Sequence, residues 1–229
     1  GLGDVYKRQI LQFPQTRWSF SHLRELLPSV QVARGKGAAS PLPRAERGDI
    51  DALVFTLLGS DRTMTWEQSL KANYTDGILV LHRGQVVYER YFGALTDQGQ
   101  HIAMSVTKSF IGTLAAMLVE EGSIDPQAKV SHYVLELRDS AFGDATVRQV
   151  MDMTVGVRYS EDYADPKAEI WEYLRAAHMT SRPEGYVGAT AVTEYLMKLR
   201  KEGEHGQAFA YKTVNTDAVS YTHLTLPTS

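Results

Sequence analysis

The chain has 229 residues, a formal net charge of −3 and no cysteine, which excludes disulfides, thiolate metal sites and a cysteine nucleophile. Its 43% hydrophobic and 22% charged residues are the proportions of an ordinary globular protein. This charge balance gives no reason to expect nucleic acid as a partner, and no apolar run reaches the roughly 18 residues of a membrane span.

The two ends differ in character from the sequence between them. Residues 1–9 and 220–229 resemble translated sequencing-adapter sequence, and segments of that kind are left out of fold reasoning. We expect a non-native flank at 1–9, one incomplete domain at 10–219 and a non-native tail at 220–229. The compartment is open on this view: the cytoplasm is weakly favoured, and the periplasm is the alternative.

Short elements are predicted in the first part of the chain. Residues 19–27 could form a helix, and residues 49–55 fit a helix or a strand equally well. Thr65 and Gln68 have the spacing of a capping box, in which each side chain binds the backbone N–H of the other residue. This spacing predicts a helix that runs to about Lys71.

The clearest β pattern follows. Residues 77–81 and 85–91 are rich in β-branched and aromatic side chains, and Gly84 between them suits a tight turn with positive φ. An antiparallel hairpin is therefore expected. The apolar, Ala-rich run at 111–119 predicts a buried helix, with Gly122 positioned to end it.

Helical patterns dominate the rest of the chain. A second capping-box spacing predicts a helix over residues 146–153. Residues 167–177 and 193–201 have amphipathic helical patterns, and residues 214–219 read as the opening turn of another apolar helix. Strands followed by a long helix and then by several helices indicate an α+β fold.

Ser105 and Lys108 stand at the beginning of the predicted helix at 111–119. Residues three apart on a helix share a face, so the lysine amine can reach the serine hydroxyl and act on it as a base. The helix N-terminus also favours negative charge that develops near the serine. A Ser-x-x-Lys motif is nevertheless expected about once by chance in a chain of this length, so its context has to decide.

A serine nucleophile of this kind also needs an acid for the leaving group, and Tyr211 is the candidate. If the surrounding stretch is extended, the side chains of Tyr211, Thr213 and Asn215 point to one side. The alternative is a tyrosine with a buried ring and a capped hydroxyl, which composition alone favours.

Other polar groups give weaker signals. The histidines show no metal-ligand spacing, and the spacing of Asp152, Asp162 and Asp165 fits no Ca²⁺ loop. His101 lies four residues before Ser105 and could line a pocket mouth, but a catalytic role is not expected. No metal or organic cofactor is implied.

Taken together, these motifs resemble a known family. The Ser-Val-Thr-Lys motif at 105–108 and the Tyr-x-Thr-x-Asn motif at 211–215 resemble the serine β-lactamase and penicillin-binding-protein superfamily, in its class C-like branch. Three stretches resemble the 6-aminohexanoate-dimer hydrolase group: residues 13–20, 151–163 and 211–217. The resemblance implies a C-terminally incomplete β-lactamase-like α+β fold, with an antiparallel sheet, packed helices and an all-helical region.

The resemblance also implies roles for individual residues. Ser105 would be the nucleophile, with its backbone N–H as the first oxyanion donor, and Lys108 would be the general base. Tyr211 would protonate the leaving group. Thr213 and Asn215 would hold a network of proton-transfer groups around the lysine.

The implied activity is that of a serine hydrolase acting through an acyl-enzyme on an amide or ester of a small molecule or short oligomer. Tyr163 resembles the tyrosine that contacts the scissile amide in amide-hydrolysing members, although a loop aromatic that merely covers the pocket is equally weighted. The alternatives are an esterase, a D-alanyl peptidase or a β-lactamase of the same superfamily, or a non-catalytic relative that binds ligands. Whether the chain forms a homodimer is left open.

The sequence departs from the family pattern in two places. The class C pattern is Tyr-x-Asn, whereas Thr213 stands two residues after Tyr211, which argues against penicillin as the natural substrate. No Lys-Thr-Gly-type strand follows Tyr211, and in the family that strand supplies the second oxyanion N–H. We therefore expect the 229-residue chain by itself to be unstable or inactive.

Overall fold

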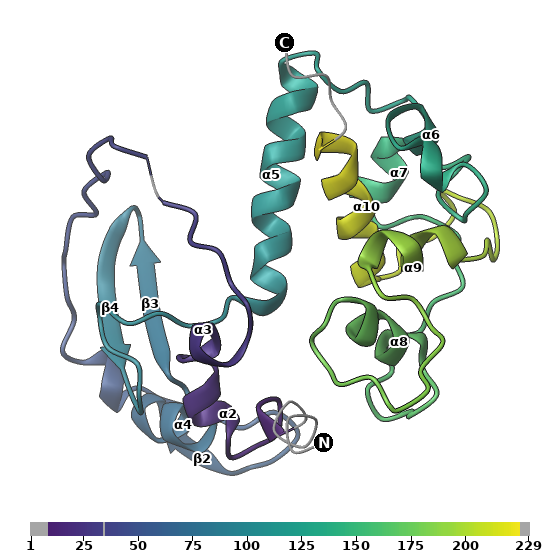
Figure 1. The fold of residues 1–229 in the computed structure, drawn as a ribbon. Helices are drawn as coiled ribbons and strands as arrows, with labels where there is room; N and C mark the ends of the chain where they lie inside the picture. Colours follow the sequence, from purple (N-terminus) through teal and green to yellow (C-terminus); the bar gives the residue numbers. More distant parts are fainter. Residues whose placement is uncertain (1–8, 34, 225–229) are drawn as a thin grey trace. The chain divides into compact units, whose positions relative to one another are not determined.

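The computed structural model of the protein describes residues 9–33 and 35–224 (Figure 1). The flank and tail expected to be foreign fall partly outside the described residues, which leave out 1–8 and 225–229. The chain divides into two compact units, which are described separately: an N-terminal unit, Gln9–Ile102, and a C-terminal unit that begins at Ala103.

The predicted hairpin is present in the N-terminal unit. Strand β3 (Gly77–His82) pairs with β4 (Gln85–Tyr91) in antiparallel register, with Gly77 opposite Tyr91. Arg83 and Gly84 form the connecting turn at φ 51° and 77°, the left-handed conformation that matches the twist of a two-residue hairpin. The glycine turn and the β-branched residues around it therefore predicted the positions of both strands correctly.

A second, smaller sheet lies in the same unit. Strand β1 (Val54–Thr56) pairs with β2 (Thr63–Thr65), and helix α4 (Trp66–Ala72) follows directly. The predicted capping box is confirmed, because Gln68 N–H donates to Thr65 Oγ1 at 3.1 Å and Thr65 N–H donates to Gln68 Oε1 at 2.8 Å. The other elements are short: α2 (Thr16–Ser19), α3 (Leu23–Leu26) and the 3-10 turn η1 (Ile50–Ala52).

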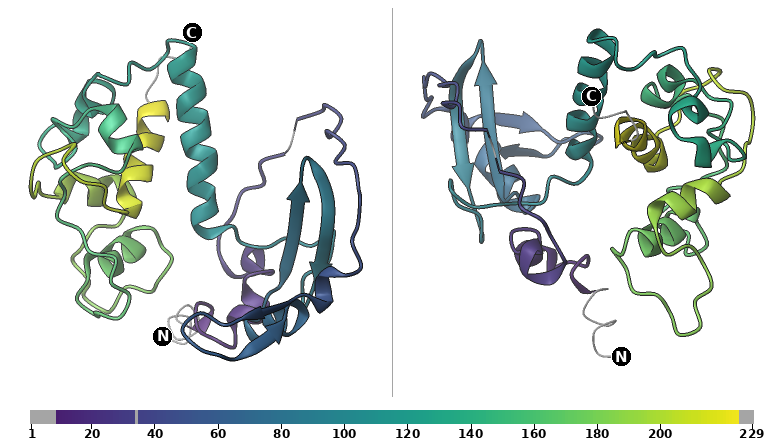
Figure 2. Two further views of the ribbon diagram at one scale, coloured as in Figure 1. Left: turned by 180° about the vertical axis from the view of Figure 1, so that it is seen from behind. Right: turned by 45° about the horizontal axis from the view of Figure 1, so that its top comes forward.

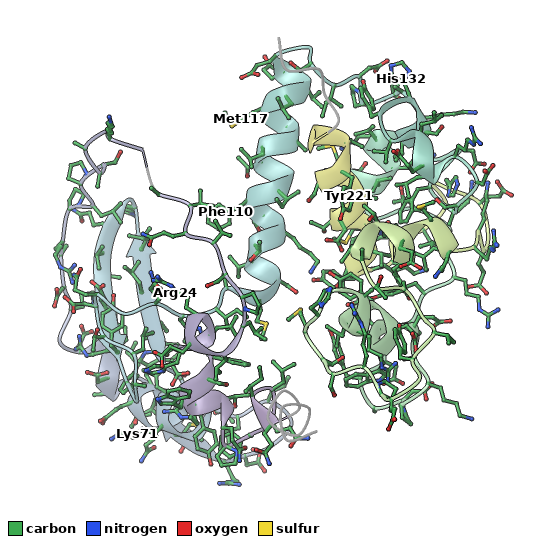
Figure 3. The ribbon with its side chains drawn as sticks, in the orientation of Figure 1. Arg24, Lys71, Phe110, Met117, His132 and Tyr221 are labelled. Carbon is green, nitrogen blue, oxygen red and sulfur yellow. The ribbon has the colours of Figure 1, made fainter. Side chains whose placement is uncertain are left out.

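In the C-terminal unit the long helix α5 (Thr107–Glu120) differs from the expectation of a buried helix. Ala115 is fully buried, and Ile111 and Leu118 are half-buried against the core of this unit. Phe110, Leu114 and Met117 are large apolar side chains of this helix that are at least half exposed among the described residues. Figure 3 labels Phe110 and Met117 on the helix. An apolar run without periodicity does not show which stripe of a helix is packed, and here only one stripe is.

The remaining elements of the C-terminal unit are helical. Among the described residues of the chain, no helix is long and apolar enough to cross a membrane. The capping box at Thr146 and Gln149 is confirmed, although the helix ends two residues before the expected limit. The helices are α6 (Val130–Tyr133), η3 (Leu135–Leu137), α7 (Val147–Met151), α8 (Glu169–Ala176), α9 (Val192–Lys198) and α10 (Thr213–Leu224).

Helix α10 lies at the centre of this unit. It contacts α5, α6, α7 and α9, and the two views of Figure 2 both show it beside α5. Val214 and Ala218 on α10 are fully buried, as is Ala115 on α5, so small side chains allow the two helices to approach closely. Ser105 and Tyr211 lie just before the first turns of these two helices, and the packing of α5 on α10 therefore brings them together.

Candidate active site

Ser105 lies in a 3-10 turn, η2 (Met104–Val106), directly before α5. The preceding residue, Met104, has φ 44°, a left-handed conformation that costs a non-glycine residue on the order of 1–3 kcal/mol. Strain of this kind persists only where surrounding structure imposes it, and it is concentrated at functional sites. The nucleophile candidate thus follows a residue in an unfavourable backbone conformation.

The predicted serine–lysine contact is present in the structure. Lys108 is half-buried in the first turn of α5, and its Nζ lies 3.1 Å from Ser105 Oγ. The contact follows from the helical spacing, because residues three apart lie on the same face.

Tyr211 reaches the same serine oxygen from 106 residues away in the sequence. Its hydroxyl lies 2.8 Å from Ser105 Oγ, and Lys108 Nζ lies 5.2 Å from the centre of its ring. An ammonium at this distance from an aromatic face is attracted to the ring, so the lysine contacts both partners. A hydroxyl, an amine and a phenol therefore meet at one point.

This arrangement is chemically suited to proton transfer. Serine and tyrosine hydroxyls can each donate or accept a hydrogen bond, and a neutral lysine amine can accept one. A proton can then pass from Ser105 Oγ to Lys108 Nζ. Tyr211 can donate a proton to the leaving group of a substrate that Ser105 attacks. Tyr211 is 46% exposed, so the side chain is not enclosed by the described residues.

Thr213 and Asn215 are not on one side with Tyr211, because the stretch is not extended. Thr213 begins α10, and helical residues two apart point about 200° away from each other. Both hydrogen bonds of Thr213, from its N–H and its hydroxyl, go to the Glu161 carboxylate at 2.6 Å each. Asn215 is 1% exposed, and its amide has no hydrogen-bond partner among the described residues.

Tyr163 lies at the edge of the site. It is 61% exposed, and its ring meets Trp171 edge-on at a centroid distance of 6.0 Å. Partial burial of its hydroxyl, the Glu161 carboxylate and the nearby Tyr211 together raise the pKa of the Tyr163 phenol. The Tyr163 ring thus contacts a neighbouring aromatic residue edge-on, and Tyr211 contributes electrostatically to the raised pKa of its phenol.

Sequence reasoning missed two carboxylates near the site. Glu161 binds the start of α10, and Asp217 lies on the buried side of the same helix. Burial raises the pKa of Asp217 to about 6, although a hydrogen bond from Tyr173 and the positive charge of Lys108 act in the opposite direction. The only available signal was position: Glu161 falls within the family-like stretch at 151–163, and Asp217 within that at 211–217.

The raised pKa of Asp217 predicts a pH-dependent stability. The charged carboxylate is costly to bury, so its penalty is fully present above pH 6 and fades as the pH falls towards the ordinary value of 3.8. The unfolding free energy of Asp217→Asn minus that of the parent chain should increase by roughly 2–3 kcal/mol as the pH is raised from about 4 to about 7. Urea unfolding of both chains at these two pH values measures the difference; a constant difference would contradict the assignment.

The other polar candidates have hydrogen-bond partners within their own units. His101 belongs to the N-terminal unit and binds Asp76 there, with His101 Nε2 3.2 Å from the carboxylate. Asp162 and Asp165 accept hydrogen bonds from nearby loop N–H groups at 2.9 Å each. Among the described residues, no three or more His, Asp or Glu side chains are grouped so that they could hold a metal ion.

Comparisons with known proteins agree with the sequence motifs. Residues 67–221 match the family model Beta-lactamase. The chain is 37% identical over 208 residues to 6-aminohexanoate-dimer hydrolase of Paenarthrobacter ureafaciens, a match that covers 91% of this chain and 50% of the relative. The chain thus spans about half the length of the curated relative that it matches.

Solved structures show the same likeness. A Bacillus anthracis protein, assigned provisionally as a 6-aminohexanoate-dimer hydrolase, superposes with a TM-score of 0.87 at 29% identity, over 96% of this chain and 57% of that one. A provisionally assigned β-lactamase of Bacteroides dorei matches with a TM-score of 0.51 at 16% identity, over 69% and 44% of the two chains, and shows the fold alone. The predicted β-lactamase-like α+β fold is confirmed, and the chain belongs to the Beta-lactamase family.

Proposed function

We propose that the protein is a serine hydrolase that cleaves an amide or ester bond through an acyl-enzyme. The observation that carries this proposal is that Ser105 Oγ is hydrogen-bonded both to Lys108 Nζ, at 3.1 Å, and to the Tyr211 hydroxyl, at 2.8 Å. A nucleophile in contact with a base and an acid is the arrangement that acyl transfer requires.

Acylation proceeds in one proton circuit. Ser105 Oγ bonds to the substrate carbonyl carbon as its proton passes to Lys108 Nζ, which acts as the base. Tyr211 gives its phenolic proton to the leaving nitrogen or oxygen as the bond to the carbonyl carbon breaks. The phenolate then recovers a proton from the Lys108 ammonium, which restores both groups.

Deacylation uses the same groups in reverse. Water approaches the acyl carbonyl from the side that the leaving group has vacated, and the Tyr211–Lys108 pair removes its proton. The bond between the carbonyl carbon and Ser105 Oγ breaks, and the serine oxygen regains its proton. We assign stabilisation of the oxyanion in both steps to the Ser105 N–H, which lies close to the N-terminus of α5.

The family likeness supports a small or short-oligomer substrate. The curated relative is named for hydrolysis of the 6-aminohexanoate dimer, a linear amide, and Thr213 departs from the class C Tyr-x-Asn pattern. We therefore favour a linear amide or a related ester over a β-lactam. Tyr163, whose family counterpart the resemblance links to the scissile amide, is the residue we assign to contact with the scissile bond.

A covalent serine reagent tests the proposal. A fluorophosphonate should add one equivalent to the chain, and peptide mapping should place the adduct on Ser105. Ser105→Ala should abolish labelling, whereas Ser109→Ala, which removes an exposed serine one turn further along α5, should leave it unchanged. Because labelling is stoichiometric, it does not depend on turnover.

Two outcomes of the labelling experiment would contradict the proposal. Labelling that persists in Ser105→Ala would show that another residue reacts. Ligand binding by a folded chain whose Ser105 is not labelled would favour the non-catalytic alternative. Acylation by a linear amide, an aryl ester and a labelled penicillin, compared by intact mass, then separates the candidate substrate classes.

A further inference from the structure

We propose that Glu161 is a positioning residue for the acid: its carboxylate clamps the beginning of α10 and thereby holds the Tyr211 hydroxyl on Ser105. This inference rests on the proposed function, and it assigns to Glu161 a part in one step of that function, the protonation of the leaving group.

The clamp consists of two hydrogen bonds to one residue. Glu161 Oε2 accepts from the Thr213 N–H and Glu161 Oε1 accepts from the Thr213 hydroxyl, each at 2.6 Å. Thr213 is the first residue of α10, where an N–H group lacks a helical partner and the helix dipole favours an anion. A charge-assisted pair of this kind is stronger and more directional than a neutral contact.

Tyr211 is tethered to the same part of the chain on both of its sides. Before it, the Ala210 N–H donates to the Met153 carbonyl at 3.0 Å. After it, the Lys212 ammonium donates to the Val157 carbonyl, and Thr213 donates to Glu161. The position of the phenol therefore depends on the stretch at 153–161, and among these contacts Glu161 is the one residue of that stretch that binds through its side chain.

This stretch is itself fixed by the rest of the C-terminal unit. Gly156 binds the His205 ring through its N–H at 3.0 Å, and its carbonyl accepts from Glu202 N–H at 3.1 Å. A Cβ at Gly156 would lie 2.6 Å from the Gly203 carbonyl oxygen, so the two backbones are in close contact. Glu161 thus belongs to a stretch whose backbone is held by the rest of the unit, and its hydrogen bonds to Thr213 restrict the position of Tyr211.

Loss of the clamp should affect one chemical step more than the others. Ser105 and Lys108 lie in the 3-10 turn η2 and the first turn of α5, and Glu161 makes no hydrogen bond to either residue among those described. A leaving group that departs readily as an anion, such as p-nitrophenolate, needs no proton from Tyr211, whereas an alkoxide or an amine does. A misplaced Tyr211 therefore slows reactions with poor leaving groups selectively.

The test compares two esters of one acyl group, a p-nitrophenyl ester and an alkyl ester, by the rate at which each acylates Ser105 in the intact chain. Glu161→Ala should slow the alkyl ester by about tenfold or more and the aryl ester by less than about threefold. Thr213→Val, which removes half of the clamp, should shift the ratio in the same direction. Thr213→Ser, which keeps both donors, should recover most of it, and the exposed-carboxylate variant Glu204→Ala should match the parent chain.

Equal slowing of both esters by Glu161→Ala would overturn the inference, because a general structural defect does not distinguish leaving groups. A folded parent chain that neither ester acylates, and in which a fluorophosphonate also fails to label Ser105, would instead contradict the proposed function. In that case the clamp is still tested by ¹⁹F NMR with 3-fluorotyrosine, with Tyr211→Phe assigning the resonance. The Tyr211 signal should shift in Glu161→Ala and stay in place in Glu204→Ala; an unchanged signal in both would show that the clamp does not position the phenol.

Discussion

Lys108→Ala is expected to slow acylation of Ser105 by about 10³-fold, because a serine hydroxyl without an adjacent base is a weak nucleophile. In the structure the lysine amine is the one basic group with a hydrogen bond to Ser105 Oγ among the described residues. The measurement is the rate of labelling by a fluorophosphonate, followed by intact mass. Lys198→Met, which removes an exposed lysine paired with Glu194, is the matched control and should label at the parental rate.

The same variant offers a test by chemical rescue. Truncation at Lys108 opens a space beside Ser105, and added methylamine can occupy it and supply the missing base. A rate that rises with methylamine concentration in Lys108→Ala, and stays flat in the parent chain, identifies the amine as the active group. Labelling at the parental rate by Lys108→Ala without any added amine would exclude the assigned role.

Tyr211→Phe is expected to separate substrates by their leaving groups. Removal of the phenolic hydroxyl takes away the proton donor and keeps the ring beside Lys108, so acylation by an alkyl ester or an amide should fall by about 10²-fold or more. Acylation by the p-nitrophenyl ester should change far less. Tyr74→Phe in the N-terminal unit, where the ring is exposed, is the control.

The double variant Glu161→Ala/Tyr211→Phe tests whether the two residues act on the same step. If Glu161 acts through Tyr211, then adding Glu161→Ala to Tyr211→Phe should cause little further loss with the alkyl ester. Independent, additive losses would mean that Glu161 acts on the reaction by another route. A Tyr211→Phe chain with an unchanged ratio of the two ester rates would remove Tyr211 from the role of acid.

Elements that depend on local chemistry could be predicted from the sequence. The hairpin of β3 and β4 follows from β-branched strands around a glycine turn, and the two capping boxes follow from the spacing of a threonine and a glutamine. The burial of α5 could not be predicted in the same way. Its apolar residues surround the helix, and which stripe packs depends on α10, whose first residue is more than ninety positions away.

The site divides along the same line. Ser105 and Lys108 are neighbours through helical spacing, which the sequence states directly. Tyr211 was a candidate acid from the residues, and the family resemblance implied the same role. The alignment with Thr213 and Asn215 depended on an extended stretch, and that condition is not met because α10 begins at Thr213. Glu161 gave no local signal, since it meets Thr213 across 52 residues and only the folded chain brings the two together.

The two parts of the site are consequently built by separate routes. The 3-10 turn η2 and the first turn of α5 hold the nucleophile and its base, whereas the acid, Tyr211, lies in a segment that is hydrogen-bonded to the stretch at 153–161. Substitutions in that stretch can therefore alter how well difficult leaving groups are expelled without any change in the nucleophile's helix. The reaction of a covalent inhibitor with a good leaving group would depend on Ser105 and Lys108 and not on Tyr211. Family members that cleave very different amides should therefore react with a panel of such inhibitors at similar rates.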